Sequence, residues 1–269
     1  MGNKMSLKVC IVGAAGRMGK NIAAIISADS NANVSGALDR QGSEAIGQLI
    51  YEFAGCGKGG VPITDDFKKA VTGADVIIDF TGAPVTISRL SDYESAGVPL
   101  VVGSTGFSPE QKAQLASLAC KIPLLVAPNM SLGVNVMFHL AAMAAKSLKG
   151  YDIEIVETHH RMKKDAPSGT ALGIAEAVAK AANIDLEQQA VYSRHGLIGE
   201  RKENEIGIQT LRGGDVVGDH TVFFFGNGER IEITHRAHTR ATFAEGAVTA
   251  AKWLKDKPVG LYSMQDVLF

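Results

Sequence analysis

The chain has 269 residues, of which 46% are hydrophobic and 20% charged, the composition of a globular protein able to bury a core. Its formal net charge of -1 excludes a global positive field, so nucleic acid is not an expected partner and anion binding must come from local clusters. The three cysteines, Cys10, Cys56 and Cys120, are odd in number and far apart, which fits neither a disulfide framework nor a metal knuckle.

The sequence carries no signal for export or membrane insertion. No apolar run approaches the roughly 20 residues of a bilayer-spanning helix, and the N-terminus lacks the apolar region of a signal peptide. Met1, Gly2 and Ser6 match the loose myristoylation pattern, but so short a match is frequent by chance. We therefore expect a cytoplasmic protein with no membrane partner.

From residue 8 to about residue 127, short apolar runs alternate with helical segments, which is typical of a parallel sheet wound by helices. The predicted strands are residues 9–12, 34–38, 76–80, 100–103 and 124–127. The predicted helices are residues 18–27, 85–96 and 109–119, and Pro109 suits a first helical turn. This half predicts an α/β, Rossmann-like, doubly wound sheet.

A glycine-rich turn follows the first predicted strand and opens the first predicted helix. It runs Gly13-Ala14-Ala15-Gly16-Arg17-Met18-Gly19. Small residues allow a pyrophosphate to approach the backbone, and the helix N-terminus supplies N–H donors. The spacing G-x-x-G-x-x-G is not the commoner G-x-G-x-x-G, and a plain tight turn is the alternative. Its position between strand and helix favours a dinucleotide site.

Asp39 and Arg40 end the second predicted strand, where a carboxylate would accept hydrogen bonds from ribose hydroxyls. The acid favours NAD and the adjacent Arg suits the 2′-phosphate of NADP, so the pair indicates use of NADH or NADPH. Solvated surface charges are the alternative. Loops after the fourth and fifth strands should also line the cofactor crevice, at residues 103–106 and 127–131.

After residue 133 the pattern changes to that of an α+β domain. A helix is predicted at 134–148, a strand at 153–158 and a helix at 171–182. Three strand-like segments follow at 206–211, 221–225 and 230–235, with turns at 213–214 and 226–228. They predict an antiparallel sheet. A final helix at 243–254 could return to either domain.

Residues 159–171 form the most informative run of the chain. Two adjacent imidazoles, His159 and His160, and three further cations precede a Pro-Ser-Gly-Thr sequence that should open a helix. Ser168 or Thr170 can cap this helix, whose first-turn N–H groups favour a carboxylate or phosphate. A histidine beside a bound anion is a natural proton donor. A solvated basic loop is the alternative.

Other charged groups leave more than one interpretation. A metal site of His159, His160, His235 and His238 would lack a cysteine or a spaced carboxylate, so no metal is expected. Structural hydrogen bonding is favoured for His235 and His238, whereas Arg240 is either a substrate contact or a surface cation. Exposed loop charge is favoured for a further group: Arg194, His195, Glu200 and Arg201.

Several blocks together resemble one family, 4-hydroxy-tetrahydrodipicolinate reductase, also called dihydrodipicolinate reductase, of the diaminopimelate route to lysine. The blocks are residues 13–19, 103–107, 129–135, 159–170, 191–194, 199–201, 212–215 and 260–267. The resemblance covers nearly the whole chain, and residues 159–170 are its most specific part.

The resemblance implies NAD(P)H-dependent reduction of 4-hydroxy-tetrahydrodipicolinate with loss of water, and a homotetramer assembled through the sheet of the second domain. Residues 1–130 and 241–269 would bind the dinucleotide, and residues 131–240, an inserted domain with a mixed or antiparallel sheet, would bind substrate and oligomerise. Cofactor contacts would come from Gly13, Ala14, Ala15, Gly16, Arg17, Met18, Asp39, Arg40, Gly103, Ser104, Thr105, Ala127, Pro128, Asn129 and Met130.

For catalysis, the resemblance makes His159 the proton donor and acceptor and Lys163 a second proton donor. Substrate, a cyclic imine with two carboxylates, would be held by His160, Ser168, Gly169 and Thr170. Two competing interpretations remain: another Rossmann oxidoreductase acting on a sugar or semialdehyde, and a non-enzymatic NAD(P)H sensor.

One departure from the family concerns the adenosine end of the cofactor. Many members carry an Arg after the Asp-Phe-Thr of the third strand, but here Asp79-Phe80-Thr81 is followed by Gly82. This removes a possible partner for the 2′-phosphate. We expect Arg40 to hold any preference for NADPH nearly alone.

Overall fold

The computed structural model describes residues 6–269, so Met1 and Gly2 of the myristoylation pattern lie outside the described residues. The described chain divides into two compact units, residues 6–131 with Ala241–Phe269, and Leu132–Arg240. The division falls after Ser131, one residue later than expected. Helix α10 (Ala241–Leu254), which the sequence could assign to either domain, belongs to the first unit.

The first unit is built on a six-stranded parallel sheet with the order β11-β5-β4-β3-β1-β2. Its strands are β1 (Leu7–Val12), β2 (Ala32–Leu38), β3 (Val76–Asp79), β4 (Leu100–Val102), β5 (Pro123–Val126) and β11 (Gly260–Tyr262). Strands β3 and β4 are buried at every residue, because helices cover both faces of a parallel sheet. The predicted Rossmann-like, doubly wound sheet is confirmed.

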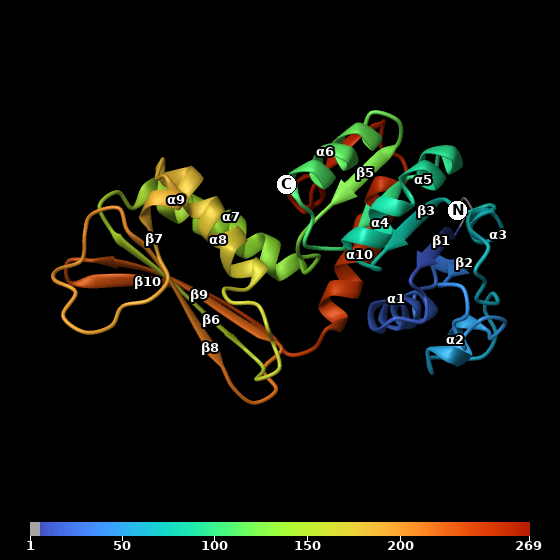
Figure 1. Ribbon diagram of the computed structural model, residues 1–269, viewed down its shortest axis with the longest axis horizontal. Helices are drawn as coiled ribbons and strands as arrows, with labels where there is room; N and C mark the ends of the chain where they lie inside the picture. Colours follow the sequence, from blue (N-terminus) through green and yellow to red (C-terminus); the bar gives the residue numbers. More distant parts are fainter. Residues whose placement is uncertain (1–5) are drawn as a thin grey trace. The chain divides into compact units, whose positions relative to one another are not determined.

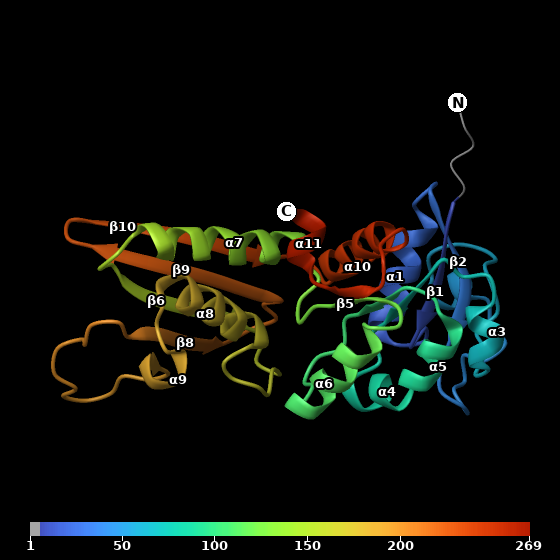
Figure 2. The same cartoon turned by 90° about the horizontal axis from the view of Figure 1, so that it is seen from above.

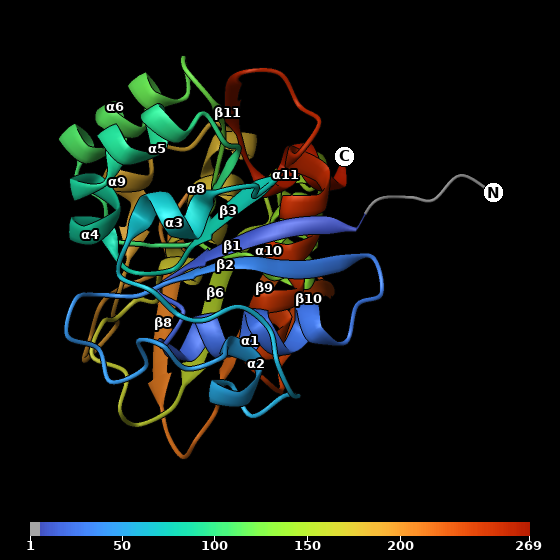
Figure 3. The same cartoon turned by 90° about the vertical axis from the view of Figure 1, so that its right-hand side faces the viewer.

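Helices cover this sheet on both sides (Figures 1 and 3). Helices α1 (Arg17–Ser27) and α10 pack on one face. The other face carries α3 (Phe67–Val71), α4 (Ala83–Ser88), α5 (Leu90–Ala96) and α6 (Pro109–Leu118). Two short helices complete the unit, α2 (Ile50–Phe53) and α11 (Met264–Leu268). Helix α1 buries Ile22, Ala23 and Ile26, whose spacing places them on one side of the helix.

The prediction of one helix over residues 85–96 is wrong. Helix α4 ends at Ser88 and α5 begins at Leu90, with Arg89 between them at φ −105° and ψ 6°. Thr86 from α4 and Tyr93 from α5 both donate to Oδ2 of the buried Asp79, at 2.8 and 2.9 Å. The break lets two helices contact one carboxylate, and no local periodicity encodes such a contact.

The second unit has a five-stranded mixed sheet with the order β10-β9-β6-β8-β7. Its strands are β6 (Asp152–His159), β7 (Ala190–Val191), β8 (Ile206–Arg212), β9 (Gly218–Gly226) and β10 (Glu229–Ala237). The turn at 226–228 joins the antiparallel pair β9 and β10, as predicted. The prediction that all three late strands form one antiparallel run is wrong, because β6 lies between β8 and β9 and pairs parallel with β8.

Two long helices, α7 (Leu132–Ser147) and α8 (Gly169–Ala182), pack together on one face of this sheet (Figures 1 and 2). Strand β6 alternates buried and partly exposed residues, so Ile153 and Ile155 point toward the helices. A short helix, α9 (Leu186–Gln189), precedes β7. Across residues 6–269, no helix has both the length and the apolar composition to cross a membrane.

Candidate active site

The glycine-rich turn lies at the carboxyl end of β1 and has the backbone that a dinucleotide site requires. Gly13 adopts φ +81°, a left-handed conformation that favours glycine. A Cβ on Gly19 would lie 2.3 Å from the carbonyl oxygen of Gly13, so the helix can pack this close to the turn only without a side chain. Gly16 is the N-cap of α1 and makes no side-chain cap, so no capping side chain occupies the first-turn N–H groups where an anion would bind. These residues fit a pyrophosphate.

Asp39 follows β2, the neighbour of β1 in the sheet, and its carboxylate lies against the glycine turn. Oδ2 accepts a hydrogen bond from the Ala15 N–H at 2.6 Å, and Oδ1 accepts one from the Arg40 N–H at 2.8 Å. Asp39 is half-buried, whereas Arg40 is exposed. The carboxylate is thereby oriented at the rim of the turn, and the Arg40 side chain remains in solvent beside it.

The loops after β4 and β5 lie at the same carboxyl edge, since β3, β4 and β5 are parallel neighbours. Ser104 is buried, and its hydroxyl oxygen accepts a hydrogen bond from the Gly82 N–H at 2.9 Å. Ala127 and Met130 are buried, while Thr105 and Pro128 are exposed. Any contact that Ser104, Ala127 or Met130 makes with a cofactor would therefore come from the backbone.

Gly82 has a conformation of its own at this edge. Its φ of +133° is one that residues with a side chain rarely adopt, although a Cβ there would meet no atom within 4 Å. Where many members of the family carry an Arg, this chain thus has a glycine in a backbone conformation that favours glycine.

In the second unit, His159 ends β6 and is only 9% exposed. Its Nδ1 lies 2.5 Å from Oε2 of Glu157, two residues earlier on the same face of the strand. Burial lowers the pKa of the His159 imidazole, and the hydrogen bond with Glu157 opposes this effect without cancelling it. The inward face of β6 thus changes from aliphatic residues to a histidine and a carboxylate at its carboxyl end.

Glu157 is fully buried and accepts hydrogen bonds from three further residues of two other segments, β8 and the start of α8. Arg212 of β8 donates to both carboxylate oxygens at 2.9 Å, the Ser168 N–H donates to Oε1 at 3.0 Å, and the Thr210 hydroxyl donates to Oε1 at 3.2 Å. Burial by itself would raise the pKa of the Glu157 carboxyl, but the hydrogen bonds from Arg212, His159 and Ser168 outweigh it and lower that pKa. The sequence analysis did not single out Glu157.

Ser168 is the N-cap of α8, which decides between the two predicted caps. Its hydroxyl oxygen accepts a hydrogen bond from the Ala171 N–H at 3.1 Å. Gly169 is exposed, and a Cβ there would meet nothing within 4 Å apart from its own turn of the chain. Thr170 follows in the first turn. The structure therefore places an accessible helix N-terminus next to the Glu157–His159 pair.

Lys163 and His160 lie in the loop between β6 and α8. Lys163 Nζ is 2.9 Å from the carboxylate of Asp165, and Nε2 of His160 is 3.5 Å from the guanidinium of Arg240. The Lys163 charge acts on the His159 imidazole. A solvated loop is the right description for Arg161, Met162 and Lys164, which are exposed, and it is wrong for His159 and Ser168.

His220 of β9 is also buried, and the sequence analysis did not single it out. Its ring packs edge-on against that of His159 with centroids 5.2 Å apart, and its Nε2 lies 3.1 Å from the Ser168 hydroxyl. Burial lowers the pKa of His220 to about 3, so the ring is neutral. The only signal was its alternation with Val222 and Phe224, which places His220 on the inward face of β9.

Within residues 6–269, no three His, Cys, Asp or Glu side chains are placed to hold a metal ion.

The charged loop that contains Arg194, His195, Glu200 and Arg201 is only partly exposed. The prediction of exposed loop charge is correct for His195 and Glu200 and wrong for Arg194 and Arg201. Arg194 donates to both oxygens of Glu154 at 2.9 Å, and Arg201 bonds the carboxylate of Asp152 at 2.8 Å. The loop folds back on β6, a contact that sequence distance conceals.

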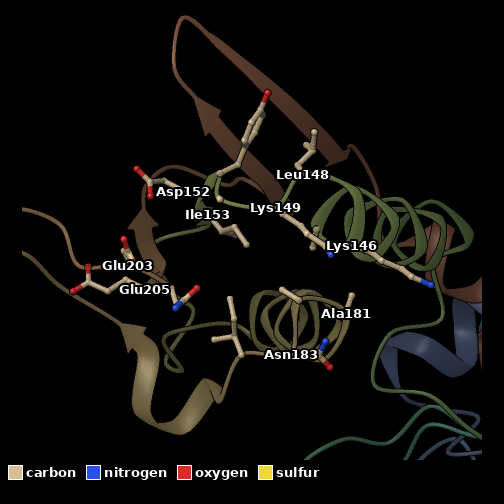
Figure 4. Close-up of a pocket in the computed structure, with 15 residues that line it drawn as sticks. Lys146, Leu148, Lys149, Asp152, Ile153, Ala181, Asn183, Glu203 and Glu205 are labelled. Carbon is tan, nitrogen blue, oxygen red and sulfur yellow. The ribbon is translucent and has the colours of Figure 1, made fainter.

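A cavity of about 740 Å³ lies elsewhere in the second unit (Figure 4). It is lined by the last turns of α7 and α8, the start of β6 and residues 203–205, with Lys146, Lys149, Asp152 and Glu203 among its side chains. None of the predicted site residues lines it. The cavity adjoins the start of β6, whereas His159 ends that strand. The cavity and His159 therefore lie at opposite ends of β6.

The parallel sheet with its glycine turn and following carboxylate, in one chain with a buried histidine–carboxylate pair, defines a nicotinamide-dependent oxidoreductase. Residues 7–130 match the family described as dihydrodipicolinate reductase, N-terminus, and residues 133–268 match dihydrodipicolinate reductase, C-terminus. The chain belongs to the dihydrodipicolinate reductase family.

Individual relatives agree over almost the full length. The 4-hydroxy-tetrahydrodipicolinate reductase of Anaeromyxobacter dehalogenans (strain 2CP-1) is 53% identical over 262 residues, which cover 97% of each chain. That of Geotalea uraniireducens is 53% identical over 97% of this chain and 98% of its own. A solved structure of dipicolinate-bound dihydrodipicolinate reductase from Paenisporosarcina sp. TG-14 has a TM-score of 0.77 at 25% identity and covers 98% of this chain and 100% of its own. The two competing interpretations are thereby set aside.

Proposed function

We propose that the protein reduces 4-hydroxy-tetrahydrodipicolinate to tetrahydrodipicolinate, with loss of water, in the diaminopimelate route to lysine. The observation that carries this proposal is the buried His159, held by Glu157 beside the N-terminus of α8, in a chain of this family. The names of the relatives support the reaction, and the dipicolinate in the solved relative supports a ring dicarboxylate as the substrate class.

The first unit would bind the cofactor, which supplies a hydride when bound. The glycine turn and the N-terminus of α1 would hold the pyrophosphate, and Asp39 would accept hydrogen bonds from the adenosine ribose. Arg40, exposed beside it, would contact the 2′-phosphate of NADPH. We infer that both NADH and NADPH serve, with the 2′-phosphate held less firmly than an arginine pair would hold it. The loops at 103–105 and 127–130 would line the nicotinamide end.

The second unit would bind the substrate. The first-turn N–H groups of α8 at Gly169 and Thr170, together with His160 and the Lys163 ammonium, would hold carboxylate oxygens. Ser168 would contribute indirectly, because its N–H bonds Glu157 and its hydroxyl caps α8. Fixing the ring in this way would hold its reacting carbon at a constant distance from His159.

His159 would supply the proton that the reduced ring requires. Reduction of the conjugated imine places an electron pair on a ring carbon, and a protonated His159 imidazole can donate its proton to that carbon. Lys163 would act as the second acid by protonating the departing hydroxyl, which leaves as water. Its ion pair with Asp165 holds the ammonium in the loop that follows His159.

The replacement His159→Gln tests this assignment. We expect kcat to fall by about 10²- to 10⁴-fold, the usual contribution of a general acid, while KM changes by no more than a few-fold. His195→Gln is a matched control, since His195 is an exposed histidine of the same unit, and should retain wild-type kinetics. A large rise in KM with unchanged kcat would instead make His159 a binding group.

We further propose a homotetramer assembled through the second unit's sheet, in the cytoplasm. The face of this sheet opposite α7 and α8 carries Phe223 and Phe225, whose rings stack 5.5 Å apart, and Leu211, which is 53% exposed. Such apolar exposure supports a surface that is covered in the assembled protein. The free thiols Cys10, Cys56 and Cys120 suit a reducing compartment.

A further inference from the structure

We propose that Glu157 is a positioning residue for His159, which holds the imidazole with its hydrogen on Nδ1 so that Nε2 is the nitrogen that gives and takes the proton. The inference rests on the proposed role of His159 and goes beyond it. Glu157 itself touches neither substrate nor cofactor in this assignment. It acts through the ring that it holds.

The donors around Glu157 determine the tautomer of His159. Arg212, the Ser168 N–H and the Thr210 hydroxyl all donate to the carboxylate, which must therefore be ionised and able only to accept. The ring nitrogen 2.5 Å from Oε2 must then be a donor, which assigns the hydrogen to Nδ1. Nε2 is left for the substrate.

Gly218 supports the same assignment from the other side of the ring. A Cβ at this position of β9 would lie 3.0 Å from Nε2 of His159. A side chain at residue 218 would therefore crowd the nitrogen that reacts. Its absence keeps space beside Nε2, while Nδ1 is enclosed by its bond to Glu157.

Glu157 also connects the proton donor to the anion site. Oε2 bonds His159, and Oε1 accepts from the N–H of Ser168, the N-cap of α8. One buried carboxylate thus sets the positions of the imidazole and of the helix N-terminus that would hold a substrate carboxylate. Small displacements between such groups cost large factors in rate.

The proton transfer follows from this arrangement. Protonated His159 loses its Nε2 proton: the N–H bond breaks, and a C–H bond forms with the electron pair on the substrate carbon. The ring becomes neutral and keeps its hydrogen on Nδ1, which continues to donate to the Glu157 carboxylate. The reaction requires the protonated ring, so activity should be lost as pH rises through the pKa of His159.

Four titratable or charged groups face this ring: Glu157 on β6, Arg212 on β8, His220 on β9 and Lys163 in the following loop. Glu157 raises the pKa of His159, Arg212 and Lys163 lower it, and His220 is neutral. Removing the Glu157 charge should therefore move the alkaline loss of activity to lower pH. Removing the Arg212 charge should move it to higher pH.

The test compares pH profiles of kcat and kcat/KM for the wild-type protein, Glu157→Gln and Arg212→Gln. We expect Glu157→Gln to lower kcat at least about tenfold and to move the alkaline limb down by about one pH unit. Arg212→Gln should move that limb up. Opposite shifts would not arise from general structural damage.

Glu154→Gln is the matched control, because Glu154 is also on β6 and also binds an arginine with both oxygens, but points to the opposite face of the strand from Glu157 and His159. Its pH profile should equal the wild-type profile. Nitrogen NMR provides a readout independent of activity: neutral His159 should carry its hydrogen on Nδ1 in the wild type and lose this preference in Glu157→Gln.

The outcomes separate the two proposals. If His159→Gln keeps its turnover, the proposed role of His159 fails, and the positioning role fails with it. If His159→Gln is inactive but Glu157→Gln keeps both the wild-type profile and the Nδ1 hydrogen, only the positioning role is overturned. Should Glu157→Gln not fold, Arg212→Gln decides, since an unshifted limb there overturns the inference.

Discussion

Two fully buried carboxylates, Asp79 and Glu157, each end or nearly end a strand and organise the residues around it. Oδ1 of Asp79 accepts from the N–H and hydroxyl of Thr81, and Oδ2 from the hydroxyls on α4 and α5. Burying a charge is costly unless hydrogen bonds satisfy it, and both groups meet that condition. Desolvation by burial, and next the nearby Asp79 charge, raise the pKa of the Tyr93 hydroxyl well above its usual value, so Tyr93 stays a donor.

At the same scale, the cofactor preference depends on Arg40. We expect catalytic efficiencies for NADH and NADPH within about tenfold of each other, or roughly 1.4 kcal/mol, because Asp39 suits the ribose and Arg40 alone serves the 2′-phosphate. Steady-state oxidation of the two cofactors with enzymatically generated substrate measures the ratio. Arg40→Ala should weaken NADPH use and spare NADH. A preference of about a thousandfold in the wild type would contradict dual use.

At the scale of elements, a glycine allows helix α3 to pack closely against strand β2. The pairing of β1 with β2 shifts register between Val9 and Cys10, opposite residues 34–36. A Cβ on Gly36 would lie 1.7 Å from the carbonyl oxygen of Ala70 in α3, so helix and strand meet with no room for a methyl group. The Ala70 carbonyl oxygen is a backbone atom, so it cannot change rotamer to make room as a side chain would.

Gly36→Ala should therefore lower the free energy of unfolding by about 1–3 kcal/mol, the usual cost of overpacking, as measured by urea denaturation. Gly57→Ala is the matched control, because its Cβ would meet only Tyr51, at an ordinary 3.8 Å. The control should unfold close to the wild type. Equal midpoints for the two variants would show that α3 can move away from β2 at little cost.

At the scale of the whole molecule, the open face of the second sheet sets the expected assembly. Phe225 is 37% exposed and Leu211 is 53% exposed, on strands that place alternate residues away from α7 and α8. Apolar residues grouped on one face in this way are typical of protein–protein contacts. The proposed tetramer should therefore depend on these residues.

Phe225→Glu should convert the proposed tetramer to smaller species, because a charge buried without a partner destabilises an interface. Sedimentation equilibrium measures the mass directly. Val85→Glu, which places the same charge at an exposed apolar position of α4 in the first unit, should remain tetrameric. A wild-type protein that sediments as a monomer would contradict the proposed assembly.

Much of the fold follows from the sequence, because the information that defines its elements is local. Alternating apolar runs and helical segments predicted the doubly wound sheet, and the glycine turn at residues 13–19 stands where strand and helix meet. The elements that were missed, such as α2, β7 and β11, are too short for a periodic pattern. The break at Arg89 was missed because it accompanies contacts with Asp79, which lies on strand β3 and not in either helix.

Part of the candidate site could likewise be predicted from the sequence, and part could not. His159, Lys163 and Ser168 lie within ten residues of one another, so their sequence already indicated an anion site with a proton donor, and the resemblance placed the chain in its family. Glu157, Arg212 and His220 come together only because β6 lies between β8 and β9. Strand register is set by burial and long-range pairing rather than by neighbouring residues. The tertiary structure alone therefore decided which nitrogen of His159 is held and which is left for the substrate.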